Sequence, residues 1–171
     1  LMWREFYDER FGFINTNLMA LGVENPPKWL GSTKLALPCV AAADVWRGFG
    51  FPTLLFLIGI YNINIDLYEA AAIDGANTWQ QFWKITMPLL KPVFSVVLVL
   101  NSNILGATQQ AMIMTEGGPQ NATMTLGLYL YNVAFQWGDM RLGYSAAVSL
   151  VLGLLGAGLS LFWFRVLRES S

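Results

Sequence analysis

The sequence predicts an all-α membrane protein, a polytopic bundle of transmembrane helices. Of its 171 residues, 55% are hydrophobic and only 12% are charged, whereas a soluble domain carries about 25% charged residues. Three segments are long and apolar enough to cross a bilayer, which takes about 20 mostly apolar residues. These segments cover residues 37–61, 92–114 and 143–167. Composition and segment length therefore indicate three spans joined by polar connections.

The composition also excludes several classes of function. The net charge of −1 provides no basic field for nucleic acid. The absence of histidine removes the commonest general base and metal ligand. No ATP-binding G-x-x-x-x-G-K-[ST] motif or catalytic constellation is present. We expect no catalytic residue, no metal site and no bound cofactor, and we expect the single cysteine, Cys39, to be buried and inert.

Residues 1–36 form a polar segment with a short amphipathic helix expected at 17–21. The chain begins within a polar, aromatic stretch, so we read it as part of a longer chain. The first span, 37–61, follows, and Gly50 and Pro52 predict a kink in it.

This first span contains ionisable residues, which within a membrane usually face a bundle interior or a watery path. Asp44 and Arg47 are three residues apart, so they share a helix face and can pair. Gly48 and Phe51 continue that face on a regular helix. A carboxylate, a guanidinium, a glycine gap and an aromatic ring would suit a polyol. The alternative is a structural ion pair that holds two helices together, and the sequence leaves both open.

The connection over 62–91 predicts a helix–glycine–helix hairpin. Asp66 is expected to cap the first helix, with Glu69 completing a capping box. Gly75 is expected to end that helix in the left-handed conformation. Thr78 is expected to cap the second helix, which Pro88 would end. The first arm is rich in alanine and the second in aromatic residues, a composition that suits a tight interface.

The second span, 92–114, carries a row of amides that are costly in hydrocarbon unless each has a partner. The polar residues of this row are Asn101, Ser102, Asn103, Thr108, Gln109 and Gln110. Of this span, Asn101, Thr108 and, less well, Leu105 fall on one helix face. They either line a solute passage or form interhelical hydrogen bonds. Residues 115–142 begin with a turn and continue into an apolar run, 125–135, that is about half a span long. The third span, 143–167, shows rows of small residues for close helix packing.

One motif in the polar connection resembles a known family. Glu69-Ala70-Ala71 is followed by Gly75, and Ile85 and Pro88 come later at fixed spacing. This matches the pattern E-A-A, three residues, G, nine residues, I, one residue, L-P of binding-protein-dependent ABC transporter permeases, except that Met87 replaces leucine. The stretches over 29–37, 68–92 and 115–135 resemble the sugar-importer branch, of the maltose and glycerol-phosphate type. The resemblance covers nearly the whole chain and corresponds to the C-terminal half of such a subunit.

The resemblance implies a type I ABC importer permease that moves a carbohydrate across the cytoplasmic membrane of a prokaryote. The loop over 62–91 would be cytoplasmic and would act as the coupling helix, and segments 1–36 and 115–142 would face outward. The expected partners are a second permease subunit, two ATP-binding subunits that hold ATP and Mg²⁺, an extracytoplasmic solute-binding protein and the lipid bilayer. The residues expected to dock on the ATPase are Glu69, Ala70, Ala71, Asp74, Gly75, Ile85 and Pro88.

The residues expected on the substrate path are Asp44, Arg47, Gly48, Phe51, Asn101 and Thr108. Charge counts on the two sides of the spans do not decide the orientation. An alternative class is part of a secondary transporter or channel with no ATPase, which explains Asp44 and Arg47 but not the loop motif. A membrane-anchored scaffold is a third class, and the intramembrane amides argue against it.

Overall fold

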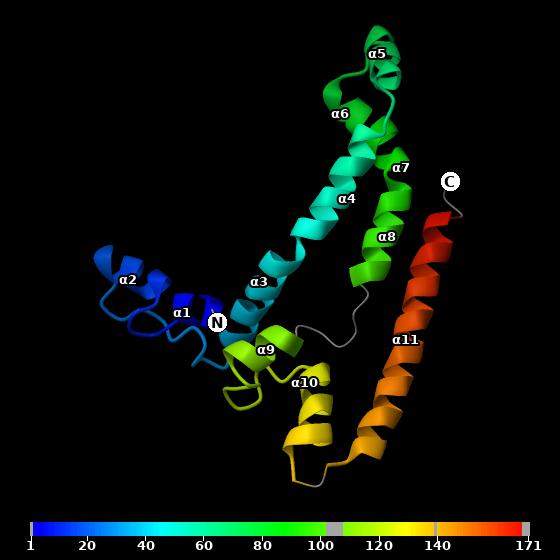
Figure 1. Cartoon of the computed structure of the whole chain (residues 1–171). Coiled ribbons are helices and arrows are strands. Elements are labelled where there is room, and N and C mark those ends of the chain that lie inside the picture. Colours follow the sequence, from blue (N-terminus) through cyan, green and yellow to red (C-terminus); the bar gives the residue numbers. More distant parts are fainter. Residues whose placement is uncertain (1, 102–107, 139, 169–171) are drawn as a thin grey trace. The chain divides into compact units, whose positions relative to one another are not determined.

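The computed structural model describes residues 2–101, 108–138 and 140–168, and these residues form helices and loops without any strand (Figure 1). They divide into two compact units. The first unit contains Leu1–Arg47 and Ile104–Leu152, and the second contains Gly48–Asn103 and Gly153–Ser171. Within the described residues, the predicted all-α class is confirmed.

The first unit starts with two short helices, α1 (Met2–Phe6) and α2 (Phe13–Ala20). The sequence predicted only one short helix, at 17–21, so this segment is more helical than expected. The unit continues with α3 (Ala36–Gly48), α9 (Thr108–Met114) and α10 (Leu126–Tyr131). A π-helical turn, η2 (Asn132–Gln136), extends α10, and the unit ends in the first part of α11 (Leu142–Arg168).

The core of the first unit joins residues that are distant in sequence. Val40 on α3, Ala111 on α9 and Leu128 on α10 are almost completely buried, and Tyr7 packs with them. Cys39 lies in the same cluster as a buried free thiol, as the sequence predicted. Because apolar burial is the main favourable term in folding, these contacts hold α3, α9 and α10 together.

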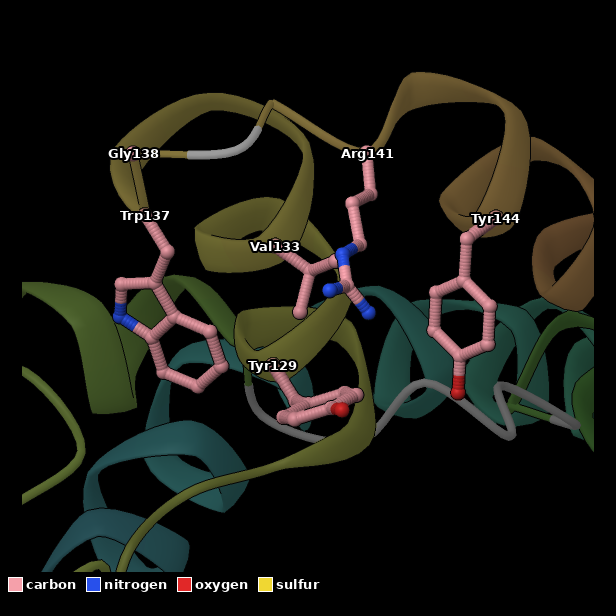
Figure 2. Close-up of a pocket in the computed structure, with 6 residues that line it drawn as sticks. All are labelled: Tyr129, Val133, Trp137, Gly138, Arg141 and Tyr144. Atoms are coloured by element: carbon pink, nitrogen blue, oxygen red, sulfur yellow. The ribbon is translucent and has the colours of Figure 1, made fainter.

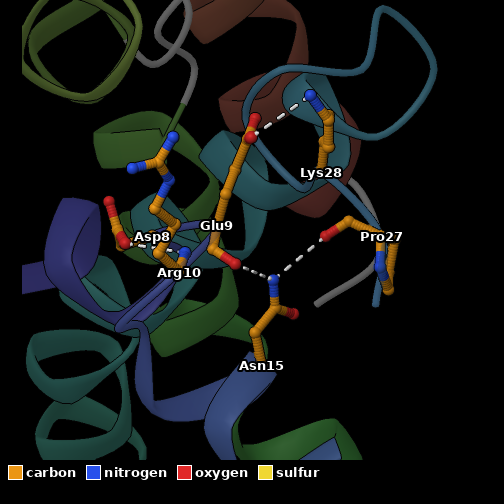
Figure 3. Close-up of polar contacts among 6 residues, drawn as sticks. All are labelled: Asp8, Glu9, Arg10, Asn15, Pro27 and Lys28. Carbon is orange, nitrogen blue, oxygen red and sulfur yellow. Dashed lines mark hydrogen bonds and ion pairs between the residues drawn. The ribbon is translucent and has the colours of Figure 1, made fainter. Parts of the chain in front are cut away.

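A buried asparagine closes the N-terminal segment on itself (Figure 3). The side chain of Asn15 is 1% exposed, and its Nδ2 donates to the backbone oxygens of Glu9 at 3.0 Å and Pro27 at 3.3 Å. Its Oδ1 accepts from Trp29 Nε1 at 2.7 Å. Lys28 forms an ion pair with Glu9 nearby, at 3.4 Å. A buried amide whose donor and acceptor are both satisfied fixes the path of the loop.

The turn that precedes α2 is also held by a side chain. Asp8 Oδ1 accepts from the backbone nitrogens of Arg10 at 2.9 Å and Phe11 at 2.8 Å. These backbone hydrogen bonds stabilise the ionised form and lower the pKa of Asp8 below its usual value.

In the second unit, α4 (Gly50–Tyr61) and α8 (Lys91–Asn101) run side by side (Figure 1). The rings of Phe56 and Phe94 meet edge to face with their centroids 4.7 Å apart. A Cβ on Gly59 would lie 2.7 Å from Val93 Cγ2 and 2.8 Å from Leu90 Cδ2. Glycine at position 59 therefore permits the close approach of the two helices.

The predicted span over 37–61 corresponds to α3 and α4, which are separated by Phe49. Gly50 is the first residue of α4, and Pro52 lies in its first turn. Proline is tolerated there because the N–H groups of the first turn have no hydrogen-bond partner within the helix. Thr53 Oγ1 bonds back to the Phe49 carbonyl at 2.8 Å. The break falls where Gly50 and Pro52 predicted a kink.

The predicted span 143–167 coincides with α11. Within the described residues, Leu142–Val166 of α11 is the one continuous helix that is long and apolar enough to cross a membrane. The predicted span 92–114 falls on α8 and α9, and residues 102–107 lie outside the described residues. By length and composition the described helices allow up to three spans, if each bent pair counts as one. The span boundaries therefore stay a prediction.

Candidate functional site

The first arm of the predicted hairpin is α5 (Ile65–Ile73), and its N-cap is Asn64. Asn64 Oδ1 accepts from the backbone nitrogen of Asp66 at 3.1 Å, and Asn64 Nδ2 donates to Asp66 Oδ2 at 3.0 Å. The prediction that Asp66 caps this helix is therefore wrong by two residues, because Asn64 already satisfies the exposed N–H. Glu69 takes no part in the cap.

The arm ends as the sequence predicted. Gly75 has a φ of +82°, in the left-handed region that glycine adopts without strain. Its nitrogen donates to Ala72 O at 3.1 Å, and the nitrogen of Ala76 donates to Ala71 O at 2.9 Å. This pair of bonds is a Schellman motif, which satisfies the last carbonyls of the helix.

The second arm starts with α6 (Thr78–Gln81), and its N-cap is Asn77 rather than the predicted Thr78. Asn77 Oδ1 accepts from Gln80 N at 2.9 Å, and Gln80 Oε1 accepts from Asn77 N at 2.9 Å. The reciprocal pair is a capping box. The boundary differs from the prediction by one residue because asparagine caps a helix as well as threonine does.

The second arm ends at Leu89, one residue after the end predicted at Pro88. It continues through a π-helical turn, η1 (Phe82–Thr86), into α7 (Met87–Leu89). Met87 N donates to Phe82 O, five residues earlier. In a regular α-helix, proline lacks one bond and clashes with the carbonyl four residues before it. Here the turn immediately before Pro88 is a wider π-helical turn, so the helix departs from α geometry without ending at the proline. The helix axis bends by 62° further on, between Leu89 and Lys91.

The hairpin lies at the tip of the second unit (Figure 1), and polar contacts of Thr86 and Gln81 hold it together. Tyr68 OH lies 2.8 Å from the hydroxyl of Thr86, which is 7% exposed. Gln81 Nε2 donates to Ala76 O at 3.2 Å, and the carbonyl of Tyr68 is 3.5 Å from the same nitrogen. The hairpin thus has a defined shape that its own residues maintain.

The residues of the family motif lie on the surface of this hairpin. Glu69, Ala70, Asp74, Gly75 and Pro88 are exposed, and Ala71 and Ile85 are half-buried. The stretch 64–76 carries three acidic residues and no basic one. Within the described part of the chain, the Glu69 carboxylate has no hydrogen bond or ion pair. The hairpin therefore presents an acidic surface that its own residues do not neutralise.

The second arm adds an exposed aromatic cluster. Trp79, Phe82 and Trp83 are 69%, 39% and 50% exposed. Their rings contact one another, with centroid distances of 5.3–5.9 Å. Trp83 also lines a cleft of about 370 Å³, together with Pro88 and Phe94. A contiguous group of exposed aromatic rings is typical of an interaction surface, because such rings are what interfaces bury at their centre.

The first unit holds a separate polar cluster. Arg47 Nη2 lies 3.1 Å from Asp44 Oδ1 on α3, and this pair was predicted from its spacing. Gln110 on α9 completes it: oriented to suit both neighbours, its amide donates to Asp44 Oδ1 at 3.0 Å and accepts from Arg47 Nε at 2.6 Å. The sequence placed Gln110 among the costly amides of 92–114, but its partners could not be read from one chain segment.

The other predicted path residues do not extend this cluster as a continuous helix face. Gly48 ends α3 and Phe51 belongs to α4, so the spacing rule that placed them on one face is interrupted at Phe49. Asn101 Nδ2 donates to Val97 O of its own helix at 2.8 Å. Thr108 lies in α9, where its hydroxyl accepts from that of Thr125 at 3.3 Å. Ser102, Asn103 and Leu105 lie outside the described residues. Whether these residues line a path is untested and stays a prediction.

The long apolar helix α11 and the all-helical fold define the class as an α-helical membrane protein. Comparison with known families then gives the assignment. The chain belongs to the family of binding-protein-dependent transport system inner membrane components, whose model matches residues 11–169. This confirms the family that the motif between Glu69 and Pro88 indicated.

Relatives within this family include transport permeases of several organisms. The trehalose/maltose transport system permease protein MalF of Thermococcus litoralis is 38% identical over 167 residues, which is 97% of this chain and 55% of MalF. The lactose transport system permease protein LacF of Rhizobium radiobacter is 36% identical over 164 residues, 92% of this chain and 54% of LacF. The chain thus spans about half the length of the curated relatives it matches.

A solved structure has the same fold. A bacterial ABC transporter involved in the import of the acidic polysaccharide alginate matches 98% of this chain with a TM-score of 0.83 and 25% identity. The match covers 58% of that transporter chain. The fold is therefore that of a type I ABC importer permease.

Proposed function

We propose that the chain is part of the permease subunit of an ATP-driven importer that carries a sugar or polyol-type solute across the cytoplasmic membrane of a prokaryote. It crosses this membrane several times and is not itself catalytic. ATP and Mg²⁺ bind to separate subunits. The hairpin over 64–90 is cytoplasmic and transmits the movement of the ATP-binding subunits to the spans.

The observation that carries this proposal is the surface of the hairpin. Caps at Asn64 and Asn77 and the contact between Tyr68 and Thr86 hold it in shape without a partner. Its motif residue Glu69 and its ring Trp79 are nevertheless left exposed. A preformed element with an acidic side and an aromatic side binds at a lower entropic cost than a flexible loop. It suits a cleft that has both apolar and basic groups.

The carbohydrate is proposed from relatives. Permeases at 38% and 36% identity are named for trehalose or maltose and for lactose. A more distant structure, at 24% identity, is an alginate transporter in complex with an alginate pentasaccharide-bound periplasmic protein. We propose the corresponding partners for this chain, namely a second permease subunit, two ATP-binding subunits and an extracytoplasmic solute-binding protein.

The solute path is proposed along Asp44, Arg47, Gly48, Phe51, Asn101 and Thr108. The Asp44–Arg47–Gln110 cluster supports a polar environment on α3 and α9. The same cluster equally suits a structural role, in which its polar contacts hold α3 and α9 together. At position 101, Asn101→Leu distinguishes the two roles. The substitution should lower solute affinity if Asn101 lines the path and leave it unchanged if Asn101 only packs against a helix.

The experiment is ATP-dependent uptake of a labelled saccharide by the complete transporter in proteoliposomes, with ATP hydrolysis measured in the same vesicles. Glu69→Lys reverses the exposed charge, and Gly75→Leu forces a branched residue into the left-handed conformation. Both variants should insert normally and lose uptake without a matching loss of ATP hydrolysis by the ATP-binding subunits.

Glu24→Lys is the matched control, because it reverses an exposed acid in the N-terminal segment and should leave uptake unchanged. Wild-type uptake in both hairpin variants would refute the coupling role. Uptake by wild-type protein that needs no ATP would instead favour a secondary transporter or channel.

A further inference from the structure

A pocket in the first unit has no role in the proposal above. It has a volume of about 520 Å³, within the size range of small-molecule sites. Its lining comes from α10, η2, the connection that follows η2 and the first turn of α11, and consists of Tyr129, Val133, Trp137, Gly138, Arg141 and Tyr144 (Figure 2). The family resemblance implied only that this stretch belongs to an outward-facing segment.

The walls of the pocket are fixed by described hydrogen bonds. Arg141 N donates to Val133 O at 3.1 Å, which fastens the start of α11 to η2. One turn further on, the hydroxyl of the buried Ser145 donates to Leu130 O at 3.2 Å. The two sides of the pocket therefore keep their separation without a ligand.

Three aromatic rings and a guanidinium share this space. Tyr129 and Trp137 meet edge to face with their centroids 5.5 Å apart. Trp137 is 47% exposed and Tyr144 is 51% exposed, so about half of each residue remains accessible. In Figure 2 the three rings and the Arg141 side chain surround the same cavity. π-helical turns such as η2 occur frequently at functional sites.

The chemistry of this lining fits a carbohydrate. One face of a pyranose ring presents C–H groups, which pack on the electron-rich face of an aromatic side chain. Its hydroxyl oxygens, or a carboxylate on an acidic sugar, accept from N–H groups of the guanidinium. The two phenol hydroxyls can donate or accept. The lining therefore combines a stacking surface with several donors.

We propose that this pocket binds one saccharide unit of the solute before that unit enters the spans. The inference rests on the proposed carbohydrate transport, because it takes the ligand class from it. It adds a second binding position, separate from the path residues on α3, α4, α8 and α9.

Direct binding tests this proposal without transport. The complete wild-type transporter in nanodiscs, without solute-binding protein and without ATP, is titrated with maltotriose and with trigalacturonate, and binding is followed by saturation-transfer NMR. At least one of the two should bind. Trp137→Ala and Arg141→Ala should each weaken that binding by at least about tenfold.

Trp137→Phe and Arg141→Lys show whether the ring and the charge are what matter. Trp137→Phe keeps an aromatic face and should retain more affinity than Trp137→Ala, and Arg141→Lys should retain more than Arg141→Ala. Phe135→Ala is the matched control, because Phe135 is an exposed aromatic residue two positions before Trp137 and lines a different cavity. This control should bind like the wild type.

Two outcomes would overturn the proposal. One is that neither saccharide binds, while ATP-dependent uptake is normal. The other is that the alanine variants bind saccharide normally and instead lose affinity for the solute-binding protein, which would make the pocket a protein interface. Because uptake is measured separately, a failure of this site is distinguishable from a failure of carbohydrate transport.

Discussion

The hairpin over 64–90 and the core of the first unit are held together in different ways. In the hairpin the contacts are local, and the side-chain hydrogen bond with the largest sequence separation joins Tyr68 to Thr86, 18 residues apart. In the core, Tyr7 and Val40 pack with Leu128, although more than half of the chain separates Leu128 from either of them. The hairpin keeps large rings exposed, whereas the core residues are almost completely buried.

This difference indicates that the hairpin surface serves association and that the core serves stability. A structure that is fixed by local caps does not use its side-chain surface for its own stability, so that surface is available to a partner. A core that is fixed by long-range burial loses its shape when the buried groups change. Substitutions in the core should therefore affect stability most, and substitutions on the hairpin surface should affect association instead.

The largest loss of stability is expected for Leu128→Ala. Leu128 is 2% exposed, and truncating such a side chain typically costs about 2–5 kcal/mol because a cavity remains. Thermal unfolding of the purified permease measures this cost. Leu126→Ala on the same helix is the control, because Leu126 is 39% exposed and should cost much less. Equal losses in the two variants would contradict the assignment of the core.

A smaller loss is expected for Asn15→Leu. This change removes three hydrogen bonds, to partly buried groups of Glu9, Pro27 and Trp29, at a cost of about 1–3 kcal/mol. Limited proteolysis should cut faster after Lys28 in the loosened loop. Asn17→Leu, on the exposed side of α2, provides the comparison and should be cleaved like the wild type.

Within the hairpin, Tyr68→Phe should cost about 0.5–1.5 kcal/mol, the net value of one hydrogen bond. Thr86→Val removes the other partner. A double-mutant cycle in chemical unfolding should give a coupling energy of similar size between the two positions. Additive effects of the two substitutions would show that this contact does not hold the arms together.

The smallest change in stability is expected for Trp79→Ala, within about 0.5 kcal/mol, because the ring is 69% exposed. Its effect should lie in association: the truncation of a central aromatic residue at an interface commonly costs about 2 kcal/mol or more. Pull-down of the ATP-binding subunit should therefore weaken while the melting temperature is unchanged. A Trp79→Ala variant with a lowered melting temperature and normal binding would contradict the assignment of the hairpin surface to association.

The local elements could largely be predicted from the sequence, because their signals lie within a few residues. Gly75 ends α5 as expected, and the break near Gly50 falls where it was predicted. The caps were misplaced by one or two residues because Asn64 and Asn77 are themselves good N-caps and lie just before Asp66 and Thr78, so each helix begins earlier than expected.

The remaining features depend on groups that the fold brings together. The pairing of Asp44 with Arg47 follows from their spacing, but the contact of both with Gln110 requires α9 to lie against α3. The pocket of Tyr129, Trp137 and Arg141 forms only because the chain turns back after η2. The pattern of residues within one segment does not show which distant segments will contact each other.

The claim that the hairpin is the docking element for the ATP-binding subunit is tested most directly by amide hydrogen exchange. The complete permease in nanodiscs is compared with and without the ATP-binding subunits. Exchange should slow over residues 65–83 and stay unchanged over 13–20 in α2. If exchange over 65–83 is the same in both samples while the subunits remain bound, the hairpin is not the docking element and the account is wrong.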